Sequence, residues 1–378
     1  MTTERSYLDH ASTSPIRTAA ADAVRAAMEE PFGDPGRIHR EGMAARVAVE
    51  QAREELATAL GARSREVVFT SGATESIAAA SYGARARGEA RGTGTHVVLC
   101  AVEHSAVREW AARGPSTVVG VDGTGRVDVD ALLDAIRDDT ALVHLQWGNH
   151  EVATLQPVTE VVAACRERGV LVHVDAAQAV GQVPVDFSAL GADLMSVSGH
   201  KFGAPTGTGA LLVRRGVRVP PLLVGGDQER ARRAGTENVL GVIGLAAAAT
   251  DACGTLDVSE AHSRSLTGRV REWAGAEAGI ELVGATASAS LPHLVCVTFE
   301  GVEPQPVLLG LDRAGVAVHS GSSCSSEALE PSPVLEAMGV DAHRSLRVSV
   351  GWSSTHADIG ALLDALPRVL ADLRSLRS

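Results

Sequence analysis

The sequence has 378 residues, of which 45% are hydrophobic and 21% charged, and this composition is typical of a globular protein with two domains or one large α/β unit. A formal net charge of -12 and only 3% aromatic residues argue against a nucleic-acid or anionic-membrane surface. Because the first residues lack a signal-peptide pattern and no apolar run reaches the length of a membrane span, we expect a cytoplasmic protein.

Short β-branched runs alternate with longer amphipathic stretches through the first two thirds of the chain. This alternation predicts an α/β fold in which a mainly parallel sheet is covered by helices on both faces. Strands that are apolar nearly throughout are predicted at residues 96–100, 141–145, 170–175, 193–197 and 209–213. Helices are predicted at residues 129–137 and 158–168, and Gly169 follows the second at the position of a C-terminal cap.

The pattern changes in the last third of the chain. A polar helical stretch at residues 259–278 precedes three short β runs, and an amphipathic helix at residues 355–376 follows them. This order predicts a smaller α+β domain. We expect a large domain at residues 16–254 and a small domain made of residues 1–15 and 255–378.

The five cysteines are widely spaced, and no CxxC pair is present. This spacing excludes a sequence-readable zinc knuckle and disfavours a disulfide framework. Cys100, Cys165, Cys253 and Cys296 lie in or beside strand and helix patterns, where free cysteine is usually buried. Cys324 lies instead in "VHSGSSCSSEALEPS", among serines with little apolar bulk, so packing does not explain this thiol.

Polar residues follow several predicted strands, at the edge of the sheet where open α/β folds bind ligands. "FTSGATES" places Ala73 and Thr74 between a strand and a helix, which suits a phosphate, although a plain helix N-cap explains the same residues. His104 also follows a strand. Asp175 ends an apolar strand, where a carboxylate is unfavourable without a cationic partner, and Gln178 lies three residues further on.

The strongest signal is the segment "SVSGHKFGAPTGTGALLV". Lys201 comes directly after a buried strand and is flanked by Ser198, His200 and glycines. A surface lysine needs no such setting, whereas a lysine that forms a Schiff base must be desolvated near positive charge. The setting therefore favours covalent binding of a carbonyl compound by Lys201.

These residues together resemble the pyridoxal phosphate (PLP) enzymes of the class V aminotransferase fold, and within it the cysteine desulfurases of the NifS/IscS kind. The similar segments run almost from end to end, and their order and spacing agree with the family as well as their content. They are "YLDHASTSP", "FGDPGRIHREG", "FTSGATES", "VEHSAV", "NHEVATLQP", "HVDAAQAVG", "SGHKFGAP", "GGDQERARRAGTEN", "SGSSCSSEALEPS" and "LRVSVG".

The resemblance implies a PLP-dependent transferase of fold type I with a mainly parallel seven-stranded sheet in the large domain. It implies that Lys201 binds PLP covalently and that His104 stacks on the pyridine ring and acts as an acid or base. It also implies that Asp175 pairs with the ring nitrogen and Gln178 with the phenolic oxygen. The implied phosphate ligands are Ala73, Thr74, Ser198 and His200, with Thr236 supplied by the other subunit of a homodimer.

The same resemblance implies conversion of L-cysteine into L-alanine, with Lys201 as the base for the α-proton. Cys324 falls on the family's catalytic cysteine, in the longer loop of the group I enzymes (about residues 319–333). It would carry the sulfur as a persulfide to an acceptor protein, either a scaffold or a sulfurtransferase. Arg347 would bind the substrate carboxylate with its two-pronged guanidinium.

Four positions depart from the family pattern. Asn149 and His150, both candidates for substrate binding, stand where the family commonly has two adjacent asparagines, and counting from Asp175 places His150 at the position that faces cofactor and substrate. The other departures are Ile77-Ala78, Thr206 and Asp227. None replaces the lysine, the aspartate or the cysteine, so they bear on rate and pathway more than on reaction type.

Two other functions stay open on the sequence. One is selenocysteine lyase, although Cys324 in a group I loop favours sulfur. The other is a non-catalytic subunit that binds PLP and a partner. The retention of four residues argues against it, namely Lys201, His104, Asp175 and Cys324. The destination of the sulfur, among iron–sulfur clusters, tRNA thiolation, DNA phosphorothioation and thiolated metabolites, does not follow from the sequence.

Overall fold

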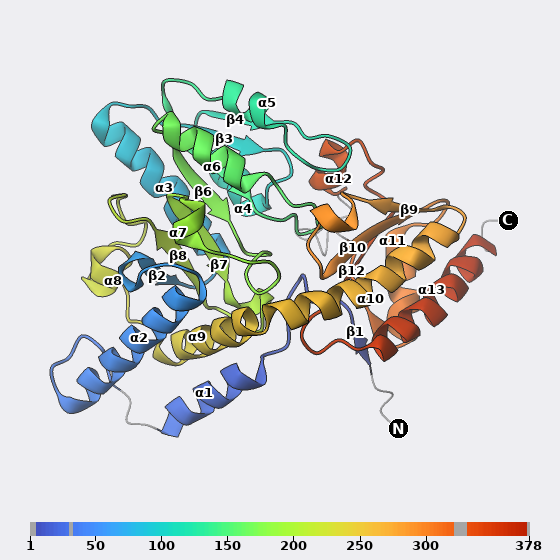
Figure 1. Ribbon diagram of the computed structural model, residues 1–378, viewed down its shortest axis with the longest axis horizontal. Coiled ribbons are helices and arrows are strands. Elements are labelled where there is room, and N and C mark those ends of the chain that lie inside the picture. Colours follow the sequence, from blue (N-terminus) through green and yellow to red (C-terminus); the bar gives the residue numbers. More distant parts are fainter. Residues whose placement is uncertain (1–4, 30–32, 321–330, 376–378) are drawn as a thin grey trace.

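The computed structural model describes residues 5–29, 33–320 and 331–375, and a seven-stranded sheet lies at its centre (Figure 1). The strand order is β2-β8-β7-β6-β5-β3-β4, and only β8 runs antiparallel to its neighbours. The strands are β2 (Val67–Thr70), β3 (His96–Cys100), β4 (Ser116–Val119), β5 (Thr140–Gln146), β6 (Leu171–Asp175), β7 (Leu194–Ser198) and β8 (Gly209–Val213). The predicted α/β fold with a mainly parallel sheet is therefore confirmed.

Successive side chains on these strands pack against helices on opposite faces of the sheet. On one face, Val97 and Leu99 share a core with α3 (Ala73–Arg91) and α4 (Ser105–Ala111). On the other face, Val98 and Cys100 share a core with residues of several further helices. Helices that contribute to this second core include α1 (Thr18–Glu29), α2 (Arg40–Ala59), α5 (Val129–Asp134), α6 (Val158–Glu167), α7 (Phe187–Leu190) and α9 (Val239–Gly254).

A smaller antiparallel sheet lies beside the large one and has the strand order β12-β10-β9 (Figure 1). Its strands are β9 (Ile280–Val283), β10 (Leu294–Phe299) and β12 (Ser345–Ser349), and its helices are α10 (Leu256–Ala276), α11 (Pro304–Arg313) and α13 (His356–Ser375). Leu266, Phe299 and Leu362 belong to the separate core that they form. The smaller α+β unit is thus present, while the exact limits of the two domains stay a prediction.

The remaining elements are short. They are β1 (Ser6–Tyr7), which pairs in parallel with β11 (Val316–Ala317), the helices α8 (Gln228–Ala231) and α12 (Pro333–Ala337), and the 3₁₀ turns η1 (Ser64–Glu66), η2 (Gly199–Lys201) and η3 (Ala287–Ala289). The helix axis bends by 73° at the break between α9 and α10. Among the described residues no single helix is long and apolar enough to cross a membrane, and only this bent pair meets that test when its halves are combined.

The segment that follows β1 contacts both parts of the molecule. The backbone of Leu8 bonds to Ala317 and Ser349 in the small part. A few residues later, the Ser14 amide donates to the carbonyl of His200, at 2.9 Å, and the Arg17 amide donates to that of Gly203 in the large part. Residues 8–17 therefore join the small sheet to the turn that carries Lys201.

Candidate active site

A cavity of about 200 Å³ lies beyond the carboxyl ends of β6 and β7 and beside the start of α3. Parallel strands direct loops and helix N-termini to this edge, which is where ligands bind in such folds. Its walls hold most of the residues singled out in the sequence. The lining residues are Ala73, Thr74, Ile77, His104, Gln146, Gly148, His150, Asp175, Ala177, Gln178, Ser198, His200 and Lys201.

Asp175 is the buried carboxylate of this cavity, with 7% of its surface exposed. Its Oδ1 accepts hydrogen bonds from the Ser196 hydroxyl at 2.6 Å and from the Ala177 amide at 3.1 Å. Within the described ranges, no basic side chain lies within 4.0 Å of Asp175, because it forms none of the ion pairs found there. A buried carboxylate without a cation fits a ligand that brings its own positive N–H.

Lys201 ends the η2 turn and is the only lysine in the whole sequence. Its Nζ donates hydrogen bonds to the carbonyl oxygens of Ala11 at 2.6 Å and Ser12 at 2.9 Å. Both carbonyls belong to the segment that crosses from the small part of the molecule. The amine therefore lies in the cavity wall, at the meeting point of the two parts.

The N-terminus of α3 forms another wall and lies close to β7 and β8. The helix starts after Gly72, whose φ of +152° disfavours a side chain and whose own lack of one leaves the first helical amides uncapped. A Cβ on Gly209 would lie 2.6 Å from Cα of Gly72, so this close approach also requires glycine. Together with Thr74 and Ser198, these amides suit a phosphate group.

His200 lies in the same region and is predominantly neutral at neutral pH. Burial, followed by the neighbouring charge of Lys201, lowers the pKa of its imidazole to about 4. It can therefore offer a hydrogen bond to a phosphate without adding a full positive charge.

His104 is fixed by the start of α4. As the N-cap residue, it accepts a hydrogen bond at Nδ1 from the Ala106 amide at 3.1 Å. This bond occupies Nδ1 and leaves Nε2 as the other ring nitrogen. The ring meets that of His150 edge-on, with centroids 5.3 Å apart and an interplanar angle of 66°.

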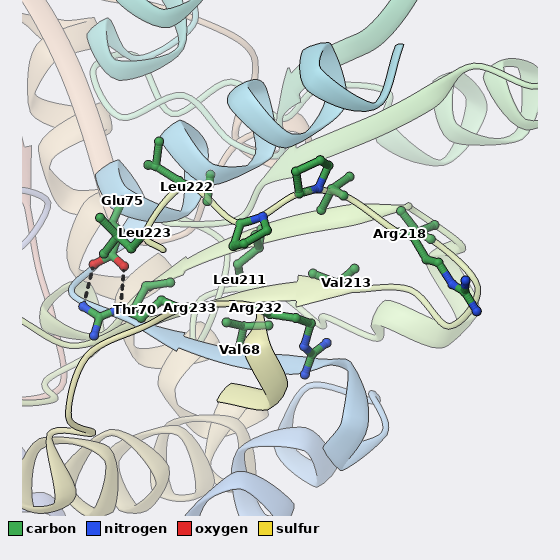
Figure 2. A pocket seen from close by; sticks show the side chains of 15 residues that line it. Val68, Thr70, Glu75, Leu211, Val213, Arg218, Leu222, Leu223, Arg232 and Arg233 are labelled. Carbon is green, nitrogen blue, oxygen red and sulfur yellow. Dashed lines mark hydrogen bonds and ion pairs between the residues drawn. The ribbon is translucent and has the colours of Figure 1, made fainter. Parts of the chain in front are cut away.

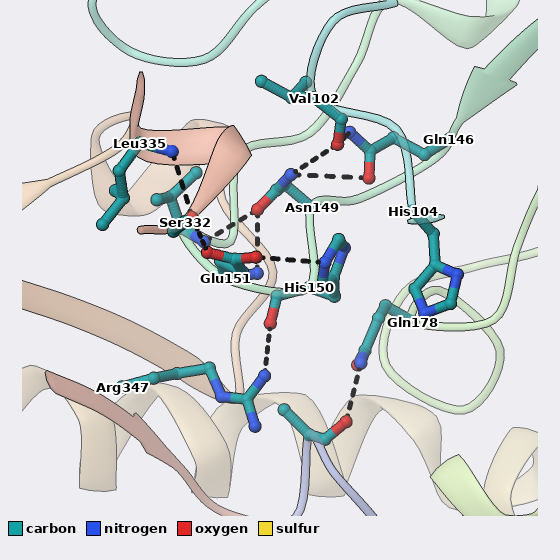
Figure 3. Close-up of polar contacts among 12 residues, drawn as sticks. Val102, His104, Gln146, Asn149, His150, Glu151, Gln178, Ser332, Leu335 and Arg347 are labelled. Carbon is teal, nitrogen blue, oxygen red and sulfur yellow. Dashed lines mark hydrogen bonds and ion pairs between the residues drawn. The ribbon is translucent and has the colours of Figure 1, made fainter. Parts of the chain in front are cut away.

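Of the two predicted substrate-binding residues after β5, only His150 lines the cavity. Asn149 is fully buried, and its Oδ1 accepts hydrogen bonds from the amides of Glu151 and Val152, both at 2.8 Å (Figure 3). Its Nδ2 donates to the carbonyl of Val102 at 3.2 Å. Asn149 therefore shapes the turn that presents His150, and the structure gives it no place in the cavity wall.

Arg347 also lies outside the cavity wall and is 1% exposed. Its Nη1 donates to the carbonyl of His150 at 2.9 Å (Figure 3). Its Nη2 donates to Asp9 Oδ1 at 2.8 Å and to Ser12 Oγ at 2.7 Å. In this structure, Nη1 and Nη2 of the guanidinium therefore form hydrogen bonds with other residues of the chain. Its assignment to a substrate carboxylate stays a prediction.

Gln178 does line the cavity, and its amide is held on both sides. Nε2 donates to the carbonyl of Ala11 at 2.9 Å, and Oε1 accepts from Nε2 of His293 at 3.2 Å. Burial is the first cause that lowers the pKa of His293 to about 3, so its ring is neutral.

Thr236 lies apart from these residues, in a second cavity of about 230 Å³ that Thr70, Ser71 and Arg233 also line. Arg233 forms an ion pair at 2.9 Å with Glu75 in the first turn of α3, next to a third, largely apolar cavity of about 160 Å³ (Figure 2). The cavity of Lys201 does not include Thr236 from the same chain. Cys324 lies outside the described residues.

Sequence reasoning missed three residues that support the cavity. Ser196 could have been found, because Ser196 and Ser198 alternate on an otherwise apolar strand and so share a face. Glu103 is 1% exposed, accepts the Gln146 amide at 2.8 Å, and has its pKa raised to about 8 by burial and then by the charge of Asp175. No local pattern marks Glu103 or His293, because only tertiary packing buries them.

Comparisons with known proteins agree with this geometry. Residues 6–362 match the family model described as aminotransferase class-V. The chain belongs to the class V aminotransferase family. Within it, the chain is 42% identical over 381 residues to the IscS-like cysteine desulfurase of Mycobacterium tuberculosis, covering 97% of both chains.

A second relative and a solved structure point the same way. The chain is 40% identical over 379 residues to the cysteine desulfurase IscS of Dictyoglomus turgidum, covering 98% of this chain and 95% of the relative. A solved NifS-like protein superposes with a TM-score of 0.91 at 31% identity, covering 98% of this chain and all of that one. Within the class V family, the chain is thus of the IscS/NifS-like cysteine desulfurase type.

Proposed function

We propose that this chain is a PLP-dependent cysteine desulfurase that converts L-cysteine into L-alanine and moves the sulfur to Cys324. The observation that carries the proposal is the joint placement of two groups in one cavity of about 200 Å³. They are the only lysine of the sequence and a buried carboxylate with no basic partner among the described residues. Full-length relatives named as cysteine desulfurases support the choice of substrate.

The residues present fit PLP. Lys201 would bind its aldehyde, Asp175 would face the ring nitrogen, and the uncapped start of α3 with Thr74 and Ser198 would hold the phosphate. When bound, PLP supplies an electron-accepting ring that makes the α-proton of the amino acid acidic and allows the C–S bond to break.

The chain's own residues then hold and transfer the protons of the reaction. Asp175, supported by Ser196, keeps a proton on the facing ring nitrogen, since a buried carboxylate stabilises a positive N–H. Lys201 takes the α-proton and later returns a proton to carbon. His104 is oriented by the Ala106 amide, which occupies its Nδ1.

Substrate binding and sulfur transfer complete the proposal. Arg347 binds the substrate carboxylate if its fork exchanges Asp9 or Ser12 for the ligand. The Cys324 thiolate attacks the substrate sulfur and carries it as a persulfide to an acceptor protein. Thr236 of one subunit contributes to the phosphate site of the other in a homodimer, and we place the protein in the cytoplasm.

Borohydride reduction followed by peptide mass mapping tests the cofactor site. Because the sequence has no other lysine, a pyridoxyl adduct on an ε-amine can only lie at Lys201. We expect this adduct in the wild type and its loss in Lys201→Arg. Absence of the adduct from wild type that was purified with PLP would overturn the proposal.

Product analysis tests the reaction. The wild type should release one alanine per cysteine consumed, and Cys324→Ser should bind PLP normally but form no persulfide. A variant that kept full turnover without this thiol would remove Cys324 from the mechanism. Measuring alanine from cysteine and from selenocysteine in parallel separates a desulfurase from a selenocysteine lyase, and no alanine from either would favour a non-catalytic subunit.

A further inference from the structure

Glu151 is a buried carboxylate next to the cavity, with 3% of its surface exposed. Its Oε2 accepts a hydrogen bond from the Ser332 hydroxyl, and its Oε1 lies 3.4 Å from Nε2 of His150 (Figure 3). Its amide is fixed by Asn149 at 2.8 Å. Both carboxylate oxygens therefore face groups that can donate a hydrogen bond.

A buried carboxyl group requires polar partners for its oxygens. Throughout the part of the chain that the structure describes, His150 is the only basic side chain within 4.0 Å of Glu151. The Glu151 oxygen therefore favours the Nε2–H tautomer of His150 and orients its ring, as a carboxylate does for a catalytic histidine.

The other ring nitrogen of His150 is the one available to a ligand. His150 lines the cavity, and its Nδ1 forms no hydrogen bond within the described ranges. His104 differs in this respect, because its Nδ1 already accepts the Ala106 amide. Three histidines line the cavity: His104 has this nitrogen occupied, His200 lies beside Lys201 on η2, and His150 presents its Nδ1.

Charged groups of both signs surround His150. Glu151 lies on one side, and the basic groups are Arg347 on β12, which binds the His150 carbonyl at 2.9 Å, and Lys201 on η2. On the remaining sides lie the His104 ring of α4 and the Asp175 carboxylate of β6.

We propose that His150 is a second acid/base group of this site, which accepts the proton of the substrate thiol at Nδ1 as the sulfur leaves. The proposal rests on the proposed desulfurase function. The S–H bond breaks with its electron pair left on sulfur, and the proton passes to Nδ1. The C–S electron pair stays with the carbon fragment, and the Cys324 thiolate supplies the pair of the new S–S bond. The carbon then takes up a proton, so cysteine and the Cys324 thiol yield alanine and a persulfide without an external oxidant.

Activity measurements on His150→Asn and His150→Ala test this assignment. Asparagine can form a hydrogen bond but cannot take a proton, so His150→Asn should lower kcat roughly 100-fold, as loss of a general base typically does, with a smaller change in KM. Added imidazole should restore part of the activity of His150→Ala but none to His150→Asn. The exposed His343→Asn is the matched control and should match the wild type.

Nuclear magnetic resonance of histidine-labelled protein gives a readout that does not depend on activity. In the cofactor-free wild type, ¹⁵N shifts should show the Nε2–H tautomer for the signal that His150→Asn removes, and Glu151→Gln should shift this equilibrium. The Nδ1–H tautomer, unchanged kcat in His150→Asn, or no rescue by imidazole would each overturn the proposal. An inactive wild type would instead overturn the desulfurase function itself.

Discussion

Ser196 and Asp175 are directly opposite each other on the neighbouring strands β7 and β6, and the Ser196 hydroxyl donates to Oδ1 of Asp175 at 2.6 Å. Their side chains share the face of the sheet that packs against α3. This bond occupies one carboxylate oxygen and orients the other relative to the cavity.

Removing this hydroxyl should weaken the cofactor site. A hydrogen bond to a charged group contributes about 1.5–3 kcal/mol, so Ser196→Ala should lower PLP affinity by roughly tenfold or more. Titration of the cofactor-free variant with PLP, followed by its absorption band, measures this change. The exposed Ser188→Ala is the control, and equal affinity in the two variants would show that Ser196 does not support Asp175.

The buried Glu103 carboxyl should make stability depend on pH. Its pKa rises from 4.5 to about 8 on folding, chiefly through burial, so the folded state holds the proton more tightly than the unfolded state does. Its contribution is therefore fully present below pH 4.5 and declines as pH rises through about 8. Glu103→Gln should lack this decline.

Urea unfolding of the wild type and Glu103→Gln across this pH range provides the measurement. Contributions of other groups cancel in the difference between the two proteins. The free energy of unfolding of the wild type minus that of the variant should fall with rising pH. A difference that is constant would mean that Glu103 is ionised in the folded state.

The close contact between β8 and the start of α3 should leave no room for a side chain at position 209. A Cβ at position 209 would lie 2.5 Å from the Val197 carbonyl oxygen and 2.6 Å from Cα of Gly72. Gly209→Ala should therefore displace the first turn of α3 and weaken PLP binding, as seen in the same titration. Gly268→Ala, where a Cβ meets nothing within 4 Å, should bind PLP as the wild type does.

Arg53 and Glu229 form a buried ion pair that should dominate local stability. Nη1 and Nη2 of Arg53 donate to the two carboxylate oxygens at 2.6 and 2.7 Å, and both side chains are at most 3% exposed. Arg53→Met leaves the carboxylate buried and unpaired, so it should destabilise the protein by about 3–5 kcal/mol.

Denaturant unfolding compares this pair with an exposed one. Arg25 and Asp22 are 68% and 59% exposed, so Arg25→Gln should change stability by less than about 1 kcal/mol. A similar small effect of Arg53→Met would show that the buried pair is replaceable.

The sequence was sufficient to predict the strands of the large sheet, because these strands are buried on both faces and so appear as continuous apolar runs. The bounds of β3 and β8 are those predicted, and β5, β6 and β7 differ by one residue at their ends. The predicted helix at residues 129–137 is shorter and ends at Asp134, because the Arg137 carbonyl instead accepts the Thr140 amide in a turn that leads into β5.

The cavity was predictable as far as residues follow strands or begin helices. Asp175, His104 and Lys201 all occupy such positions and do meet in the structure. The partners of Lys201 were not predictable, because the carbonyls of Ala11 and Ser12 are brought to it across about 190 residues of chain by tertiary folding. No local sequence pattern predicts such contacts.

Residues 8–17 connect the small part of the molecule to the large part, so that movement of one part affects the other. Leu8 is bonded to β11 and β12, while the carbonyls three and four residues later hold the amine of Lys201. Any rotation of the small part relative to the large part must therefore displace the carbonyl groups that bind this amine. Proteolysis within this short stretch would release that restraint with a single cut, while both hydrophobic cores stayed largely intact.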